Sequence, residues 1–238
     1  MATETERRVG APIKSSPRST GKASERRERP RKRRAEVIDA AVQIFHEKGY
    51  EASTIQDIAD AVGVLKGSLY YYFTSKEDVL FEILQEVHEE ALAAAVEAIE
   101  LDGDPVEKIY AFVQTLARFN ADNKVRMGIL LHDFRSLSQP RIKQIVAERD
   151  RYEAILRQLI LDGQEQQLIC PDIDPKLATR ALMGMINTIY EWFSPRGGRS
   201  SRYVGSFFAS LAVNALSCSP DTHIPGHIAI PGRSSQRR

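Results

Sequence analysis

Residues Thr54 to Lys76 have the sequence TIQDIADAVGVLKGSLYYYFTSK, and this stretch decides the fold. Its first half carries apolar residues at the i, i+3, i+4, i+7 spacing of one helical face, namely Ile55, Ile58, Ala59 and Val62. Gly63 then ends the helix, because glycine takes the left-handed conformation at little steric cost. A second short helix is predicted from about Leu65 to Phe73. The stretch therefore predicts two short helices joined by a tight turn.

The start of the first of these helices has two candidate caps. Ser53 with Gln56, or Thr54 with Asp57, has the spacing of a capping box. Either pair would satisfy backbone N–H groups that the first helical turn leaves without partners. The helix is therefore expected to begin within one residue of Thr54.

The second predicted helix carries three consecutive tyrosines, Tyr70, Tyr71 and Tyr72. They point in three directions around a helix, so they cannot all be buried. Each has a flat apolar ring and a hydroxyl that can donate to a phosphate or a base edge, and Lys66 beside Gly67 permits close approach to a phosphate backbone. The pattern favours a DNA-reading helix-turn-helix. The alternative is an ordinary helical hairpin with tyrosines on its surface.

A longer segment, Gly49 to Leu80, closely resembles the amino-terminal DNA-binding domain of the TetR family of bacterial transcriptional regulators. The matching residues are Gly49, Thr54, Ile58, Ala59, Gly63, Lys66-Gly67, Leu69-Tyr70, Tyr72-Phe73 and Ser75-Lys76-Glu77. The resemblance implies an all-α, dimeric protein with a three-helix DNA-binding domain at its amino terminus. It also implies a repressor that releases DNA when a small ligand enters a larger carboxy-terminal domain.

The resemblance assigns DNA contacts residue by residue. Phosphate contacts are expected from Thr54, Tyr72 and Lys76, and the residues nearest the groove are expected to be Lys66, Gly67, Ser68, Tyr70 and Tyr71. The family often has a small polar residue where Leu65 stands, which puts base readout at that position in doubt. Arg33 joins the predicted contacts because it lies in the basic run next to the first helix.

Charge is distributed unevenly along the 238 residues. Residues 1 to 34 hold twelve Lys or Arg and four Glu, whereas the rest of the chain holds 21 basic and 28 acidic residues. A basic arm on an acidic body suggests nucleic-acid contact at one end. The amino terminus lacks the apolar centre of a signal peptide, and no apolar run is long enough to span a bilayer. Two cysteines fit a reducing compartment, so a cytoplasmic location with no membrane partner is expected.

Helical periodicity divides the chain into four parts. Residues 1–30 are expected to be a disordered basic arm, either solvated or lying along DNA, and residues 217–238 a disordered tail. Residues 31–76 are expected to form the helix-turn-helix domain. Residues 77–216 are expected to form the domain to which the family resemblance assigns ligand binding and dimerisation. The expected helices span about 31–48, 54–62, 65–73, 75–100, from 105 onward, 124–134, 139–167, 174–194 and 200–216. Hydrophobic residues make up 42% of the chain, enough for a packed core.

Residues 174–216 carry apolar side chains on more than one helical stripe. Two such helices from each subunit would bury the surplus in a four-helix interface, which predicts a homodimer. The alternative is a pair of helices fully enclosed within one subunit.

A ligand pocket is expected among the helices of the carboxy-terminal domain. Its candidate residues are polar side chains and aromatic walls on largely apolar helices: Arg118, Arg126, Phe134, Arg149, Tyr152, Asn187 and Trp192, with Asn120 and His132 as further candidates. Residues 174–198 also resemble a subgroup of TetR-type regulators that control lipid and sterol breakdown and sense acyl-coenzyme A thioesters. This resemblance makes an acyl-CoA the first expected ligand, with other small hydrophobic ligands (a free fatty acid, a steroid or a xenobiotic) as alternatives.

Two other classes of function remain open from the sequence. A helical enzyme would need a catalytic constellation, but the five histidines are scattered and no nucleophile sits with a base. An architectural DNA-binding protein would have no small-molecule ligand. No motif for a metal or an enzymatic cofactor occurs, so neither is expected.

Overall fold

The computed structural model describes residues 20–100 and 102–217, and for residues 20–31 the backbone alone. Every regular element in these ranges is helical, so the prediction of an all-α fold is confirmed. The elements are α1 (Thr20–Lys48), α2 (Ile55–Val62), α3 (Lys66–Leu69), α4 (Lys76–Ile99), α5 (Pro105–Asp122), α6 (Lys124–Asp133), the 3-10 turn η1 (Phe134–Ser136), α7 (Gln139–Glu165), α8 (Pro175–Asn187), α9 (Ile189–Trp192) and α10 (Ser201–Leu216). No described helix is long and apolar enough to cross a membrane.

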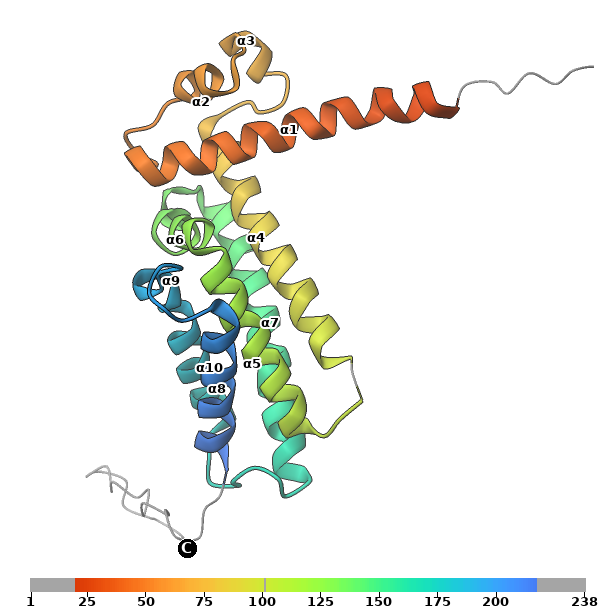
Figure 1. Cartoon of the computed structure of the whole chain (residues 1–238), viewed down its shortest axis with the longest axis vertical. Coiled ribbons are helices and arrows are strands. Elements are labelled where there is room, and N and C mark those ends of the chain that lie inside the picture. The colour runs from red at the N-terminus through yellow and green to blue at the C-terminus, as the bar shows by residue number, and fades with distance from the viewer. Residues whose placement is uncertain (1–19, 101, 218–238) are drawn as a thin grey trace, which may run out of the picture.

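The molecule has a head, α1–α3, and an elongated body, α4–α10 (Figure 1). Helix α1 lies across one end of the body, with α2 and α3 on its outer side, and its amino-terminal half extends past the other head helices. Helix α4 begins at the head and runs along the body. It is therefore the element that belongs to both parts.

Local sequence signals set most of the helix boundaries. The Thr54 side chain accepts from the Asp57 backbone N–H and Asp57 bonds back to the Thr54 N–H, which decides between the two candidate capping boxes. Gly63 closes α2 with φ of 69°, in the left-handed region that favours glycine. Asp104 caps α5 in the same reciprocal way with Glu107.

Helix α1 is longer than the sequence predicts. It begins at Thr20 rather than near Arg31, so residues 20–30 of the expected disordered arm are helical. Residues 22–29, KASERRER, are mostly Lys, Arg and Glu, which are good helix formers. A helix already nucleated by packed residues adds further turns at little cost, even without apolar contacts. Residues 1–19 of the arm, and 218–238 of the expected tail, lie outside the described residues.

Two other predicted helices are shorter than expected. Helix α3 ends at Leu69, and the next residues turn through i→i+3 bonds from Tyr71 N–H to Ser68 and from Tyr72 N–H to Leu69. Consecutive aromatic residues have weak helix propensity, which accounts for the early end. The expected helix over 174–194 divides into α8 and α9, because the Thr188 hydroxyl donates to the Met185 carbonyl at 2.9 Å and competes with the backbone ladder.

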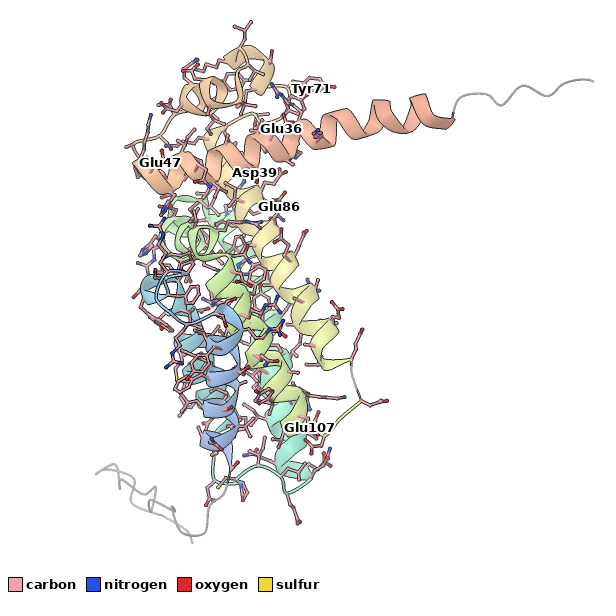
Figure 2. All side chains as sticks on the ribbon, in the orientation of Figure 1. Glu36, Asp39, Glu47, Tyr71, Glu86 and Glu107 are labelled. Carbon is pink, nitrogen blue, oxygen red and sulfur yellow. The ribbon has the colours of Figure 1, made fainter. Side chains whose placement is uncertain are left out.

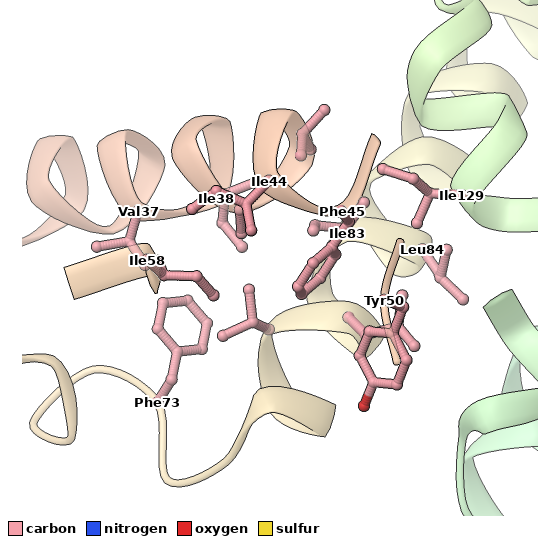
Figure 3. Close-up of a cluster of buried hydrophobic side chains, with 14 of the residues drawn as sticks. Val37, Ile38, Ile44, Phe45, Tyr50, Ile58, Phe73, Ile83, Leu84 and Ile129 are labelled. Carbon is pink, nitrogen blue, oxygen red and sulfur yellow. The ribbon is translucent and has the colours of Figure 1, made fainter. Parts of the chain in front are cut away.

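Two hydrophobic clusters form the interior. The first joins the head to the top of the body, and includes Phe45, Ile58 and Phe73 from the head with Ile83 and Ile129 from the body (Figure 3). The second fills the rest of the body, where α5, α7, α8 and α10 meet. The head therefore packs on the body through shared apolar contacts, in addition to its chain connection.

Candidate DNA interface and ligand cavity

Helix α3 presents polar and aromatic side chains to solvent and buries a single anchor. Lys66, Gly67 and Ser68 are exposed, whereas Leu69 is completely buried in the head core. Tyr71 is 84% exposed and lies at the head end of the molecule (Figure 2). Leu65, just before the helix, is also largely exposed. This surface can approach a groove without any rearrangement of the head.

Tyr70 and Tyr72 lie next to the exposed surface of α3. Tyr70 is half-exposed, and the Lys66 ammonium lies 5.9 Å from the centre of its ring. Tyr72 is half-buried, with its ring edge-on to Tyr71 at 5.3 Å between ring centres. Thr54 is exposed at the start of α2, although its hydroxyl is already bonded to Asp57.

Lys76 has a different environment from the one expected for a phosphate contact. Its ammonium donates to the carbonyl oxygens of Tyr50 at 2.6 Å, Ser53 at 2.9 Å and Glu51 at 3.2 Å, and it lies 4.2 Å from the centre of the Tyr50 ring. An ammonium has three donors, and all three are used here. The Lys76 side chain therefore closes the loop between α1 and α2, and its contact with DNA stays a prediction.

Arg33 is also held within the head. One of its terminal nitrogens donates to Glu36 at 2.6 Å and the other donates to the Val62 carbonyl at 3.2 Å. The second bond satisfies a carbonyl in the last turn of α2. Arg33 therefore ties α1 to α2, and its contact with DNA stays a prediction.

Polar contacts reinforce the junction between head and body. Ser136 in η1 donates to Glu51 at 2.9 Å, and the backbone N–H of Ser138 donates to Glu77 at 2.9 Å. Arg141 on α7 pairs with Glu77 and with Asp78, both in the first turn of α4. Burial alone would raise the pKa of Asp78, but hydrogen bonds from Thr74 and Arg141 lower it to about 2. The start of α4 is therefore held by the start of α7, whereas η1 is bonded to the loop between α1 and α2.

A cavity lies in the upper half of the body, between α4, α5, α6, α7 and α8. Its walls are mostly apolar, with a few polar groups: Val87, His88, Ala91, Leu116, Asn120, Met127, Leu130, Leu131, Phe134, Ile145, Val146, Arg149, Tyr152, Met183, Ile186 and Asn187. The empty space between them is about 680 Å³, including the part open to solvent. Apolar walls with a few polar groups are typical of a small-molecule site.

The cavity lies where the two hydrophobic clusters meet. Val87, Met127 and Ile145 in its wall belong to the cluster shared with the head. Leu116 and Ile186, on the opposite walls, belong to the cluster of the body. A molecule entering the cavity would therefore press on both cores at once.

Three polar side chains in the cavity wall, those of His88, Tyr152 and Asn120, form hydrogen bonds with each other or with the backbone. His88, which is 5% exposed, contacts the Tyr152 hydroxyl through Nδ1, and that hydroxyl also bonds the His88 carbonyl at 3.1 Å. Asn120 donates to the Ile186 carbonyl at 3.0 Å. Burial lowers the pKa of His88 to about 4 and raises the pKa of Tyr152. Both are therefore neutral at pH 7.

The predicted ligand residues divide into two groups. Phe134, Arg149, Tyr152 and Asn187 do line the cavity, as does Asn120. The other four predicted residues do not line the cavity. Arg118 is on the outer side of α5 beside Asp122, and Arg126 pairs with Glu86 and Glu90 on α4. Trp192 is 53% exposed, and His132 contacts Tyr190. Their helices were assigned correctly, but each side chain lies on another face.

His88 is the cavity residue that the sequence argument overlooked. It stands four residues after Leu84 and three before Ala91, on the apolar stripe of α4. A histidine within an apolar helical stripe is a signal of a buried polar group, and it could have been noticed. The apolar cavity residues Met127 and Met183 have no such signal, since their spacing is that of ordinary core residues.

An apolar surface lies along α8, α9 and α10. Leu177, Trp192 and Phe207 are each more than half exposed, and Leu211 is 42% exposed. Trp192 stacks on Phe208 with 6.0 Å between ring centres. Large apolar side chains gathered in this way usually mark an interaction surface.

Comparisons with known proteins agree with this architecture. Residues 37–83 match the family model described as bacterial regulatory proteins, tetR family, and residues 102–216 match that of the tetracyclin repressor-like C-terminal domain. A solved TetR family transcriptional regulator, PfmR from Thermus thermophilus, is 34% identical with a TM-score of 0.70, covering 75% of this chain and 97% of PfmR. The chain belongs to the TetR family. It is a DNA-binding transcriptional regulator with a helix-turn-helix head.

Two further proteins are similar to this chain over most of its length. The transcriptional repressor KstR2 of Mycobacterium tuberculosis is 26% identical over 187 residues, which is 77% of this chain and 92% of KstR2. AibR, solved in complex with isovaleryl coenzyme A and operator DNA, is 25% identical with a TM-score of 0.68, covering 78% of this chain and 98% of AibR. The likeness therefore extends over both the head and the body.

Proposed function

We propose that this TetR family regulator is a dimeric cytoplasmic repressor that leaves its operator when an acyl-CoA enters the cavity. The observation that supports this most directly is the position of the cavity between the core of the head and the core of the body. A ligand there has a physical route to the DNA-reading surface. Relatives include a repressor, KstR2, and a regulator, AibR, solved with an acyl-CoA and DNA.

In this proposal the groove is read by exposed residues of α3 and the turn that follows. Lys66, Ser68, Tyr70 and Tyr71 supply donors, a positive charge and flat rings, while Gly67 permits close backbone approach. Thr54 and Tyr72 lie at the edge of the same surface and would meet phosphates, which position the head without reading sequence. Lys76 and Arg33 support this surface from within the head.

The dimer would form through the apolar surface of α8, α9 and α10. Exposed Trp192, Phe207 and Leu211 would be buried against the same residues of a second copy, as a two-fold interface requires. The two heads would then meet successive major grooves, roughly 34–36 Å apart.

The switch would act through α4. Ligand must bind the DNA-incompetent arrangement more tightly, because equal affinity for both arrangements shifts nothing. Ligand pressed against Val87 and Ala91 would displace α4, whose first turn is bonded to the start of α7 through Ser138 and Arg141. Movement of these bonded residues would change the spacing of the two heads. A coupling of about 1–3 kcal/mol is typical of such systems.

The cavity favours an amphipathic, anionic ligand. An acyl chain would contact the apolar walls formed by Leu116, Met127 and Met183. The large polar portion of coenzyme A cannot lie among those walls and would remain at the opening. Arg149, which is about half exposed, is a cation in the same wall that could pair with a phosphate.

An electrophoretic gel shift with the protein's own upstream DNA tests this proposal. Acyl-CoAs of increasing chain length are added to the preformed complex, and at least one should release the DNA. Ala91→Phe fills the cavity, so an acyl-CoA should cause no further change in the affinity of this variant for DNA. Ala93→Phe, two residues along on the exposed face of α4, is the matched control and should behave as the wild type. Failure of every acyl-CoA to release the wild type, or release of Ala91→Phe at wild-type concentrations, would refute the proposal.

A further inference from the structure

The cavity wall contains one buried polar atom without a partner. His88 is 5% exposed and forms part of the wall on the α4 side. Its Nδ1 is bonded to Tyr152, whereas its Nε2 is buried and has no hydrogen-bond partner among the described residues. Buried polar atoms of side chains are nearly always paired. Nε2 has almost no accessible surface, so a ligand group can pair with it only if the wall around His88 shifts when the ligand binds.

Tyr152 limits the tautomers that His88 can adopt. The Tyr152 hydroxyl lies 3.1 Å from the His88 carbonyl and also contacts His88 Nδ1, and its single proton can go to only one of them. If the carbonyl takes it, Nδ1 carries the ring proton and Nε2 is an acceptor. If Nδ1 takes it, Nε2 carries the ring proton and is a donor. A ligand hydroxyl can pair with Nε2 in either case, whereas a methylene group cannot.

We propose that His88 Nε2 forms a hydrogen bond with a hydroxyl group on the apolar part of the ligand, so that the cavity selects hydroxylated acyl chains over saturated ones. This inference rests on the proposed function, because it concerns the ligand of the same cavity. A saturated chain leaves Nε2 unpaired. A hydroxylated chain of the same length fills the same space and pairs with Nε2.

The residues around His88 favour this selection. Tyr152 holds the His88 ring in two ways: its hydroxyl contacts Nδ1, and the two rings stack with 5.5 Å between their centres and 27° between their planes. Neighbouring wall residues Val87, Ala91 and Ile145 offer no competing hydrogen bond to a ligand hydroxyl. A site built to pair a substrate hydroxyl discriminates strongly against the analogue without it, since the buried polar atom then stays unpaired.

Calorimetric titration of the full-length protein with matched ligands tests the inference. The probes are 3-hydroxyacyl-CoA and ω-hydroxyacyl-CoA, each against the saturated acyl-CoA of equal length, and 12-hydroxydodecanoate against dodecanoate. In the wild type at least one hydroxylated probe should bind about tenfold more tightly than its saturated partner, which corresponds to about 1.4 kcal/mol.

Two variants assign the effect to His88. His88→Phe keeps a planar ring that can stack on Tyr152 but removes Nε2, so the preference should vanish while the saturated probe binds as tightly or more tightly. Tyr152→Phe removes the hydroxyl that contacts Nδ1 and holds the His88 ring, so the preference should shrink. Thermal melting of both variants establishes that each is folded under the titration conditions.

The outcomes separate this inference from the proposed function. Equal binding of hydroxylated and saturated probes, or an unchanged preference in His88→Phe, overturns the role of His88 while acyl-CoA binding stands. A hydroxyl preference seen with the fatty acids alone supports His88 and refutes the acyl-CoA assignment. Absence of binding by every probe overturns both.

Discussion

Replacing Lys76 with methionine tests whether this residue stabilises the head or contacts DNA. Methionine keeps much of the length and apolar character of the lysine side chain but removes the ammonium. The three carbonyl oxygens of Tyr50, Glu51 and Ser53 then lose their common donor. They close the loop that positions the start of α2. We therefore expect the variant to lose stability of the folded head.

The expected loss can be estimated from the geometry. Hydrogen bonds to charged groups contribute about 1.5–3 kcal/mol each. Three bonds from one ammonium are not additive, and water can reach part of this half-buried site, so we expect a loss of about 2–4 kcal/mol in the free energy of unfolding. Lys48→Met is the control, because Lys48 forms one ion pair with Asp57 at 2.7 Å and is 52% exposed. An exposed pair contributes about 0–1 kcal/mol.

The assay combines urea unfolding with operator binding at several salt concentrations. Lys76→Met should unfold at clearly lower urea than Lys48→Met. Its remaining folded population should bind operator with an unchanged dependence on salt, because no phosphate contact has been removed. Equal unfolding midpoints for the two variants, together with a salt slope reduced by about one ion, would refute the structural role. Lys76 would then be a phosphate contact after all.

Four further predictions concern the reading surface, the arm, the dimer and the cavity. Tyr71→Ala should weaken operator binding by about 1–3 kcal/mol without lowering the melting temperature, since Tyr71 is almost fully exposed; unchanged affinity would remove Tyr71 from the interface. Deleting residues 1–30 should weaken binding and flatten its salt dependence, and an identical slope would show that the arm makes no phosphate contact. Phe207→Glu should sediment as a monomer and bind operator poorly, whereas a dimeric Phe207→Glu would place the interface elsewhere. Burial lowers the pKa of His88 to about 4, below the unfolded value of about 6.5, so the unfolded chain binds more protons between these pH values. The free energy of unfolding should therefore fall as the pH drops from about 6.5 to about 4. His88→Phe should reduce this dependence of the unfolding free energy on pH, and an equal dependence in both proteins would contradict the pKa shift.

Signals that lie within a few residues of one another were sufficient to predict most of the fold. The capping boxes at Thr54 and Asp104 each involve residues three apart, and Gly63 ends α2 by its own backbone conformation. Helical stripes such as Ile55, Ile58 and Ala59 also repeat within one element. These features depend on local geometry, which the order of residues specifies directly.

Predictions failed where a side chain chooses between distant partners. Arg126 pairs with acids on α4 rather than facing the cavity. The bonds of Lys76 to carbonyls more than twenty residues earlier in the chain were likewise not foreseen. A sequence pattern places such residues on a helix, but it does not show which neighbouring helix each long side chain meets. Only the packing of α4 against α6 and the loop before α2 decides this.

The shared core beneath the head limits how this protein can be recombined with its relatives. Hybrid regulators made by joining one protein's DNA-binding segment to another's sensor would be cut near the start of α4. That cut separates Phe45 and Phe73 from Ile83 and Ile129, which pack in one cluster (Figure 3). A transplanted head would then rest on unmatched apolar surfaces and lose the hydrogen bond between Glu51 and Ser136. Successful exchange should require the facing residues of α4 and α6, together with Ser136, to be transferred with the head.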